Sequence, residues 1–342
     1  MARTLLWGSL VLAPIAVVAD DGLHLGATPL FVLSAAALVP LAWLIGEATG
    51  HAAEHTGPGV GGFLNASFGN APELIIAVLA VADGLPVVVR GTITGSVVSN
   101  LLLVLGAAMI AGGRGPVDAR SLRWQVAALG GAIVLLLAPS VPGWHGSPNR
   151  HALVVVTIPM SLVLLAAYLW ITFANLRIHR DAERKAPHSD AWSLQRSLAV
   201  LACATVATAF VSEVLVHSLR DFGETVGLSE FFIAIVIVAI VGNAAEHGGA
   251  ILIARRGNTQ LATEIAITSA MQVAVFVAPA IALISLALSH RLTLAFRPIE
   301  IGTLALATVL AWLVTRDGVS KRWEGWLLAA AYGGAVVAYY FS

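Results

Sequence analysis

Charged side chains are scarce in this sequence. Asp, Glu, Lys and Arg make up 11% of its 342 residues, whereas a typical soluble domain carries about 25%. The hydrophobic fraction is 58%, and the mean hydropathy is +0.88. This composition is typical of an integral membrane protein, so the lipid bilayer is the first partner that we expect.

An excess of charge of one sign is also missing, and cysteine is almost absent. The 19 basic and 19 acidic side chains cancel, which gives no reason to expect nucleic-acid binding. The single cysteine, Cys203, lies in an apolar run and cannot form an internal disulfide. Nothing in the sequence indicates a cofactor.

Long apolar runs make up most of the chain. A transmembrane helix needs about 20 predominantly apolar residues, and the sequence therefore predicts an all-α polytopic membrane protein with about eleven helices. The runs lie near 5–19, 29–54, 59–82, 86–112, 121–140, 150–176, 194–219, 229–254, 259–288, 298–315 and 323–341. Helix breakers between them are Gly57-Pro58-Gly59, Gly112-Gly113, Pro139 to Pro148 and Asp317-Gly318.

The first run allows two interpretations. Arg3 precedes it, and Val17-Val18-Ala19 before Asp20 resembles the cleavage site of a signal peptide. We favour a first helix that is retained. Its removal would leave the orientation of the other helices unchanged.

The basic residues predict the orientation in the membrane. The N-terminus and the loops that follow even-numbered helices carry 14 of the 19 basic residues, and the opposite side carries 5. Because Lys and Arg are enriched in cytoplasmic loops, the N-terminus is expected in the cytoplasm and the C-terminus outside. The 14 residues are Arg3, Arg114, Arg120, Arg123, Arg177, Arg180, Arg184, Lys185, Arg196, Arg255, Arg256, Arg316, Lys321 and Arg322.

One polar linker, 177–193, divides the chain into residues 1–176 and 194–342. The stretch Gly61 to Glu73 in the first part returns, in shortened form, as Gly242-Asn243-Ala244-Ala245-Glu246, 173 residues later. Two further polar pairs obey the same offset, Ser96 with Ser269 and Ser99 with Gln272. The second copy lies five helices further along the chain than the first, an odd offset, so the two halves should run in opposite directions, as in many secondary transporters.

Glu73 and Glu246 are the candidate functional residues, because ionisable groups at membrane depth are costly and mark functional sites. Asn70 and Asn243 precede them by three residues, a spacing that predicts one shared helical face. Two carboxylates that face each other, with amides and hydroxyls around them, form an oxygen-rich site suited to a hard cation such as calcium. Two close carboxylates also resist joint ionisation, so the pair can hold either protons or one divalent ion.

Pro72 predicts a freed backbone carbonyl at Phe68, because proline lacks the amide that would bond it. A bound ion could satisfy that carbonyl. Repeat 2 has Ala245 at this place, so this device is not symmetric.

Three segments resemble the CAX calcium/proton exchangers of the calcium/cation antiporter superfamily: 65–76, 95–106 and 240–247. The resemblance implies one extra helix followed by two inverted five-helix repeats. It also implies that Glu73 and Glu246 bind calcium and protons alternately. The expected helpers are Asn70, Asn243, Ser96, Ser99, Ser269 and Gln272. We expect such a transporter, which is not an enzyme, in the plasma membrane of a bacterium.

The chain departs from the family pattern where members often have Thr-Glu and this sequence has Thr49-Gly50. Glu47 or Glu54 could substitute in the first half, whereas Ser212-Glu213 keeps the acid in the second. These three carboxylates and His247, beside Glu246, are candidates for gating or proton access.

Two alternatives stay open, as does the oligomeric state. One is an exchanger coupled to sodium or to another cation pair. The other is an intramembrane zinc protease, because His51-Ala52-Ala53-Glu54-His55 matches the H-x-x-E-H pattern. The sequence disfavours the protease, since the breaker Gly57-Pro58-Gly59 is predicted to end this helix at once.

Overall fold

The computed structural model describes residues 2–22, 25–178 and 192–342, and these are almost entirely helical. Residues 179–191, which form most of the predicted linker, lie outside the described residues. Seven described helices are long and apolar enough to cross a membrane, and the pair Glu230–Gly242 and Ala244–Arg255, bent by 57°, makes an eighth if it is one span. The prediction of an all-α polytopic membrane protein is therefore confirmed, while the count of eleven helices stays a prediction.

The seven spans agree closely with the predicted apolar runs. They are Ala27–Thr56, Pro86–Gly112, Ala119–Gly143, His151–Phe173, Leu194–Val226, Thr259–Ala287 and Pro298–Thr315. Thr4–Asp20 and Ala71–Ala82 are shorter apolar helices.

The helix α3, Ala27–Phe68, runs straight through one predicted breaker. The prediction that Gly57-Pro58-Gly59 ends the helix was wrong. Proline and glycine are tolerated within membrane helices because neighbouring groups can satisfy the backbone groups that they free. The breakers at Gly113 and Gly318 are confirmed. Both glycines follow the end of a helix and have a positive φ, of 71° and 75°.

The chain forms two compact units. The first comprises Met1–Leu79, Ala166–Gly227 and Val241–Ala245, and the second comprises Ala80–Leu165, Leu228–Ile240 and Glu246–Ser342. In the first unit, α3 packs along α9, and α2 packs against both. The helices that lie wholly or mostly in it are α1 (Ala2–Ser9), α2 (Leu12–Gly22), α3, α4 (Ala71–Ala82) and α9 (Leu194–Val226).

The second unit contains most of the remaining elements. Three helices, α8 (His151–Ile178), α11 (Ala239–Gly242) and α12 (Ala244–Arg255), pass from one unit to the other. Those wholly in the second unit are α5 (Pro86–Val98), η1 (Ser99–Val104), α6 (Leu105–Gly112), β1 (Gly115–Pro116), α7 (Ala119–Gly143), α10 (Glu230–Phe232), η2 (Ile233–Val238), α13 (Thr259–Gln272), η3 (Val273–Val277), α14 (Ala278–Ile284), η4 (Ser285–Ala287), α15 (Pro298–Thr315), β2 (Val319–Ser320) and α16 (Arg322–Tyr340).

Two glycines allow close helix packing in the second unit. Gly91 and Gly95 of α5 face η2, and a Cβ on Gly95 would lie only 2.0 Å from the carbonyl oxygen of Ile235. The spacing is that of the G-x-x-x-G pattern, in which small residues let two membrane helices approach closely. The pattern brings α5, which carries Ser96, against the span that leads toward Asn243.

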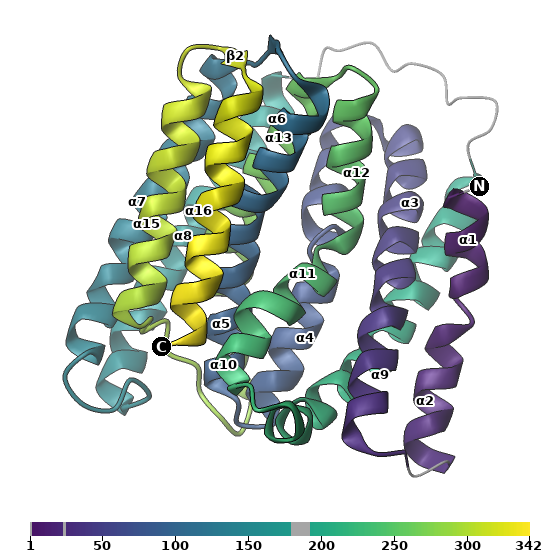
Figure 1. Ribbon diagram of the computed structural model, residues 1–342, viewed down its shortest axis with the longest axis vertical. Coiled ribbons are helices and arrows are strands. Elements are labelled where there is room, and N and C mark those ends of the chain that lie inside the picture. Colours follow the sequence, from purple (N-terminus) through teal and green to yellow (C-terminus); the bar gives the residue numbers. More distant parts are fainter. Residues whose placement is uncertain (1, 23–24, 179–191) are drawn as a thin grey trace. The chain divides into compact units, whose positions relative to one another are not determined.

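The loops of the second unit gather at two opposite ends. At one end β1 pairs with β2 in antiparallel fashion, and Ser320 Oγ donates to the carbonyl of Gly113. Figure 1 shows α15 and α16 side by side with β2 at their shared end. At the other end Thr293 Oγ1 donates to the carbonyl of Pro148 over 2.6 Å, and Arg90 Nη1 donates to Asn149 Oδ1 over 2.9 Å. Within this unit the loops thus alternate between ends as the charge pattern requires.

This alternation and the basic residues make the orientation testable. We expect a single cysteine at Ser189, in a Cys203→Ala background, to resist an impermeant thiol reagent in intact cells. A cysteine at Ser147, in a loop of the opposite side, should react quickly. Rapid labelling at Ser189 together with protection at Ser147 would overturn the predicted orientation.

Candidate cation site

Each of the two repeated motifs lies at a break between helices. α3 ends at Phe68 and α4 begins at Ala71, while α11 ends at Gly242 and α12 begins at Ala244. Asn70 and Asn243 lie in the breaks, and Glu73 and Glu246 lie in the first turn of the helix that follows. The two motifs therefore have the same local structure at the offset that the sequence predicts.

Asn70 and Asn243 each lie just before the helix that carries the carboxylate, so a face shared by each Asn and Glu stays a prediction. Asn70 precedes α4, and its carbonyl accepts the first bond of that helix, from the amide of Leu74 at 3.1 Å. Asn70 thus occupies the N-cap position, a place where asparagine is favoured. Pro72 falls in the first turn of α4, where a missing amide costs nothing. Since Ala245 has the same place after the second break, proline is not what creates the breaks.

In the first unit, Glu73 lies against the second motif. Its side chain is 4% exposed, and a Cβ on Gly242 would lie 3.7 Å from Cγ and Oε1 of Glu73. Asn70 and Asn243 are each 1% exposed. The missing side chain at Gly242 thus leaves room beside the carboxylate, at the end of a half-helix whose carbonyls can face a cation.

In the second unit, a chain of hydrogen bonds leads to Glu246. Ser269 bonds the Glu246 carboxylate through its hydroxyl, and Asn100 Nδ2 donates to Ser269 Oγ over 3.0 Å. Asn100 was missed as a site residue. It lies in the motif 95–106, but it has no polar counterpart at the offset of 173, where the sequence has Val273.

The other predicted helpers also line this part of the second unit. Ser96 and Ser99 are fully buried, and Ser99 Oγ donates to the carbonyl of Ser96 over 3.2 Å. Gln272 ends α13, which packs against α5 and η1. Both spans then continue as π-helix, at Ser99–Val104 and Val273–Val277, and π-helical turns often occur at functional sites.

The candidates for access and gating are more scattered. Glu47 Oε1 lies 3.6 Å from His51 Nε2, and Glu54 and Glu213 are exposed. His247 is 7% exposed, and its Nε2 has no hydrogen-bond partner among the described residues. The contacts of these four residues do not indicate a role for any of them, so their part in gating or proton access stays a prediction.

Both histidines of the H-x-x-E-H segment contact Trp192 in the structure. His51 stacks on the ring of Trp192 at 4.6 Å between centroids, and His55 Nε2 lies 2.6 Å from the Trp192 carbonyl oxygen. Within the described residues, no three His, Cys, Asp or Glu side chains are grouped to hold a metal ion. The histidines thus have a packing role here.

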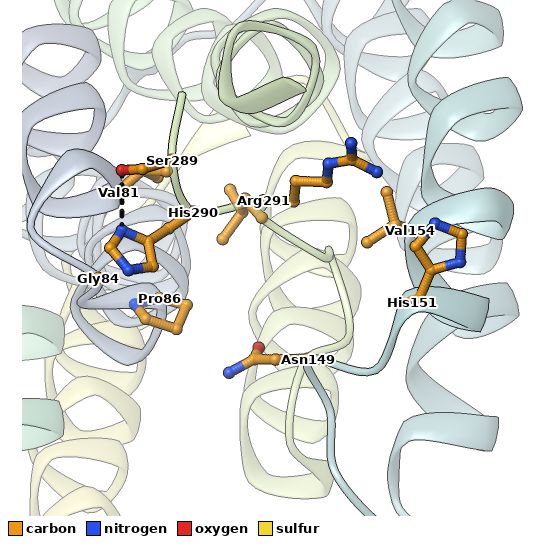
Figure 2. Close-up of a pocket in the computed structure, with 10 residues that line it drawn as sticks. Val81, Gly84, Pro86, Asn149, His151, Val154, Ser289, His290 and Arg291 are labelled. Carbon is orange, nitrogen blue, oxygen red and sulfur yellow. Dashed lines mark hydrogen bonds between the residues drawn. The ribbon is translucent and has the colours of Figure 1, made fainter. Parts of the chain in front are cut away.

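A pocket of about 350 Å³ opens at the end of the second unit where Asn149 lies. Figure 2 shows His151 and His290 on opposite sides of it. None of the predicted cation ligands lines this pocket. Its lining residues are Val81, Gly84, Pro86, Asn149, His151, Val154, Ser289, His290, Arg291 and Leu292.

Comparison with known proteins identifies the family. The profile "Sodium/calcium exchanger protein" matches residues 26–177 and 196–341. This chain belongs to that family. Among curated members, the "Ca(2+)/H(+) antiporter" of Aphanothece halophytica is 31% identical over 99% of this chain and 97% of its own length. The "Ca(2+)/H(+) antiporter ChaA" of Bacillus subtilis is 35% identical over 91% of each chain.

Solved structures of exchangers share the fold. The structure of native YfkE matches with a TM-score of 0.85 and 31% identity, covering 99% of this chain and 100% of that one. The H+/Ca2+ exchanger CAX matches with a TM-score of 0.78 at 15% identity, covering 99% and 92%. The resemblance to CAX exchangers that the motifs indicated is thereby confirmed.

Larger side chains at Gly242 test whether the space beside Glu73 contributes to calcium binding. Gly242→Ala adds only an ordinary contact and should leave calcium binding near the wild-type level. Gly242→Leu must push against the carboxylate, and overpacking of this kind costs about 1–3 kcal/mol. We expect calcium affinity, measured by calorimetry, to fall about tenfold or more.

Gly248→Leu is the matched control, because a Cβ at Gly248 meets nothing within 4 Å. Equal affinities in the two leucine variants would show that the space at Gly242 has no part in the site.

Proposed function

We propose that this protein is a secondary antiporter that exchanges Ca²⁺ for H⁺, with Glu73 and Glu246 binding the cation and protons alternately. The observation that carries the proposal is the matched placement of the two carboxylates, each in the first turn of a helix that follows a break inside an apolar protein. The two curated relatives at 31% and 35% identity, both named as Ca(2+)/H(+) antiporters, support the choice of ions.

The chemistry of the groups favours calcium on one side of the exchange. Calcium takes oxygen ligands in flexible numbers, and the two motifs offer carboxylates, the amides of Asn70 and Asn243, and the hydroxyls of Ser96, Ser99 and Ser269. Gln272 adds one further amide. The helices α3 and α11 end beside these motifs, so their last carbonyls are additional oxygen donors.

Protons suit the same groups when calcium is absent. Two carboxylates without a cation in a low-dielectric setting are strongly disfavoured as a doubly charged pair. Two protons or one divalent ion neutralise them equally. Exchange follows because neither state leaves the site charged, whereas the empty ionised site is costly to move through the membrane.

The architecture that we propose is one extra N-terminal helix followed by two inverted five-helix repeats, 1–176 and 194–342, joined by the linker 177–193. The separate profile matches to 26–177 and 196–341 support it, as do the matched helix breaks. With the N-terminus cytoplasmic in a bacterial plasma membrane, the proton motive force would drive calcium out of the cell. We propose no cofactor.

The second candidate is an exchanger coupled to sodium. It is favoured by the family description and by the fold of the sodium–calcium exchanger NCX_Mj, which matches with a TM-score of 0.58 at 18% identity. The zinc protease has no such support, since both motif histidines contact Trp192.

Reconstituted vesicles give the test of function. Protein in vesicles with an acid interior should release protons when calcium is added outside, as followed by a pH-sensitive dye. Glu73→Gln and Glu246→Gln should each reduce this exchange to background, because glutamine cannot ionise. Glu→Asp should keep partial activity, since the charge is retained.

Substitution of Glu47, Glu54 or Glu213 should be milder, altering access or pH dependence without abolishing exchange. A sodium gradient in place of the acid interior tests the second candidate. Near wild-type calcium–proton exchange in both Gln variants would rule out the shared-carboxylate mechanism.

A further inference from the structure

A cluster of charges lies at one end of the second unit, where α5, the helix that carries the site serines, packs against α15. Two of its members are buried, and the third, Arg297, is partly exposed. Arg90 of α5 is 3% exposed and Glu300 of α15 is 1% exposed. Glu300 accepts two hydrogen bonds, from Thr94 Oγ1 at 3.2 Å and from the backbone amide of Arg297 at 2.7 Å. The guanidinium groups of Arg90 and Arg297 both attract this carboxylate electrostatically.

The cluster is not neutral. Two guanidinium groups and one carboxylate leave one net positive charge. The hydrogen-bond partners of the Arg90 side chain are neutral oxygens, Asn149 Oδ1 at 2.9 Å and the carbonyl of Thr293 at 3.3 Å. The Arg297 guanidinium lies over the ring of Phe231 at 4.5 Å, which adds no negative charge.

Arg90 lies in the helix that also carries the polar residues Thr94 and Ser96. Arg90 and Ser96 lie on the same helix and are separated by about 9 Å along its axis, at 1.5 Å per residue. Thr94, which bonds Glu300, is two residues from Ser96 and points to a different face of the helix. A unit charge about 10 Å from a divalent cation, at an effective dielectric constant between about 20 and 80, changes the affinity by about fourfold or more.

We propose that Arg90, Arg297 and Glu300 set the affinity of the neighbouring cation site, their net positive charge keeping calcium binding weak enough for release. This inference rests on the proposed function, because it assigns the charge to the site where calcium is exchanged. It predicts that affinity follows the net charge of the cluster, whichever residue supplies that charge.

The test compares variants by charge in the same vesicle assay. Glu300→Gln raises the cluster to two positive charges and should increase the KM for calcium at least about fourfold. Arg297→Gln makes it neutral and should lower the KM by a similar factor. Arg297 is the gentler site for this change, because its backbone amide, which the substitution keeps, makes the bond to Glu300.

The double variant Arg297→Gln/Glu300→Gln restores one positive charge through Arg90, and its KM should return to within about twofold of the wild type. Arg90→Lys keeps the charge and should also leave the KM unchanged. A purely structural cluster predicts otherwise: both single changes would lower the maximal rate, and the double variant would be the most impaired.

The outcomes separate this inference from the function on which it rests. If the wild-type protein exchanges no calcium for protons, the proposed function fails. If the wild type exchanges but both single variants shift the KM in the same direction, or the double variant shifts it further, then the cluster does not tune affinity and only this inference fails.

Discussion

The structure depends on one electrostatic constraint, which is that a carboxylate inside an apolar protein must have its charge compensated. Glu73 and Glu246 are placed to meet that constraint in the same way. Each lies in the first turn of a half-helix, where the unbonded amides favour negative charge. The preceding half-helix offers carbonyls, which favour a cation. A helix break therefore places donors for the carboxylate and acceptors for the cation beside one another.

The packing of each unit serves these breaks. In the second unit, Gly95 lets α5 approach η2 so closely that a Cβ would overlap the backbone of Ile235. Asn100 reaches Ser269 from the same span, and Ser269 reaches Glu246. In the first unit, the glycine that ends α11 leaves room beside Glu73. Small residues and buried amides thus hold the polar groups where side-chain bulk would otherwise exclude them.

Much of the fold and of the site was predictable, because the lengths of the apolar runs and the offset of 173 residues can be read directly from the sequence. They located the spans, both carboxylates and the matched serines. Pro72 indicated irregular backbone in the first motif, but the matching break at Asn243 was not predictable, because Ala245 stands there in place of a proline. For the same reason α3 was wrongly expected to end at Pro58: the presence or absence of proline does not by itself decide where a membrane helix breaks. Asn100 escaped notice because Val273 occupies its counterpart position.

The central claim is that the two carboxylates hold either protons or a divalent cation. It is tested most directly by calorimetry of calcium binding to the purified protein at one pH, in two buffers of different ionisation enthalpy. The account predicts that the apparent binding enthalpy differs between the buffers, because calcium displaces protons from Glu73 and Glu246. Tight calcium binding with the same enthalpy in both buffers would show that no protons leave, and would contradict the account.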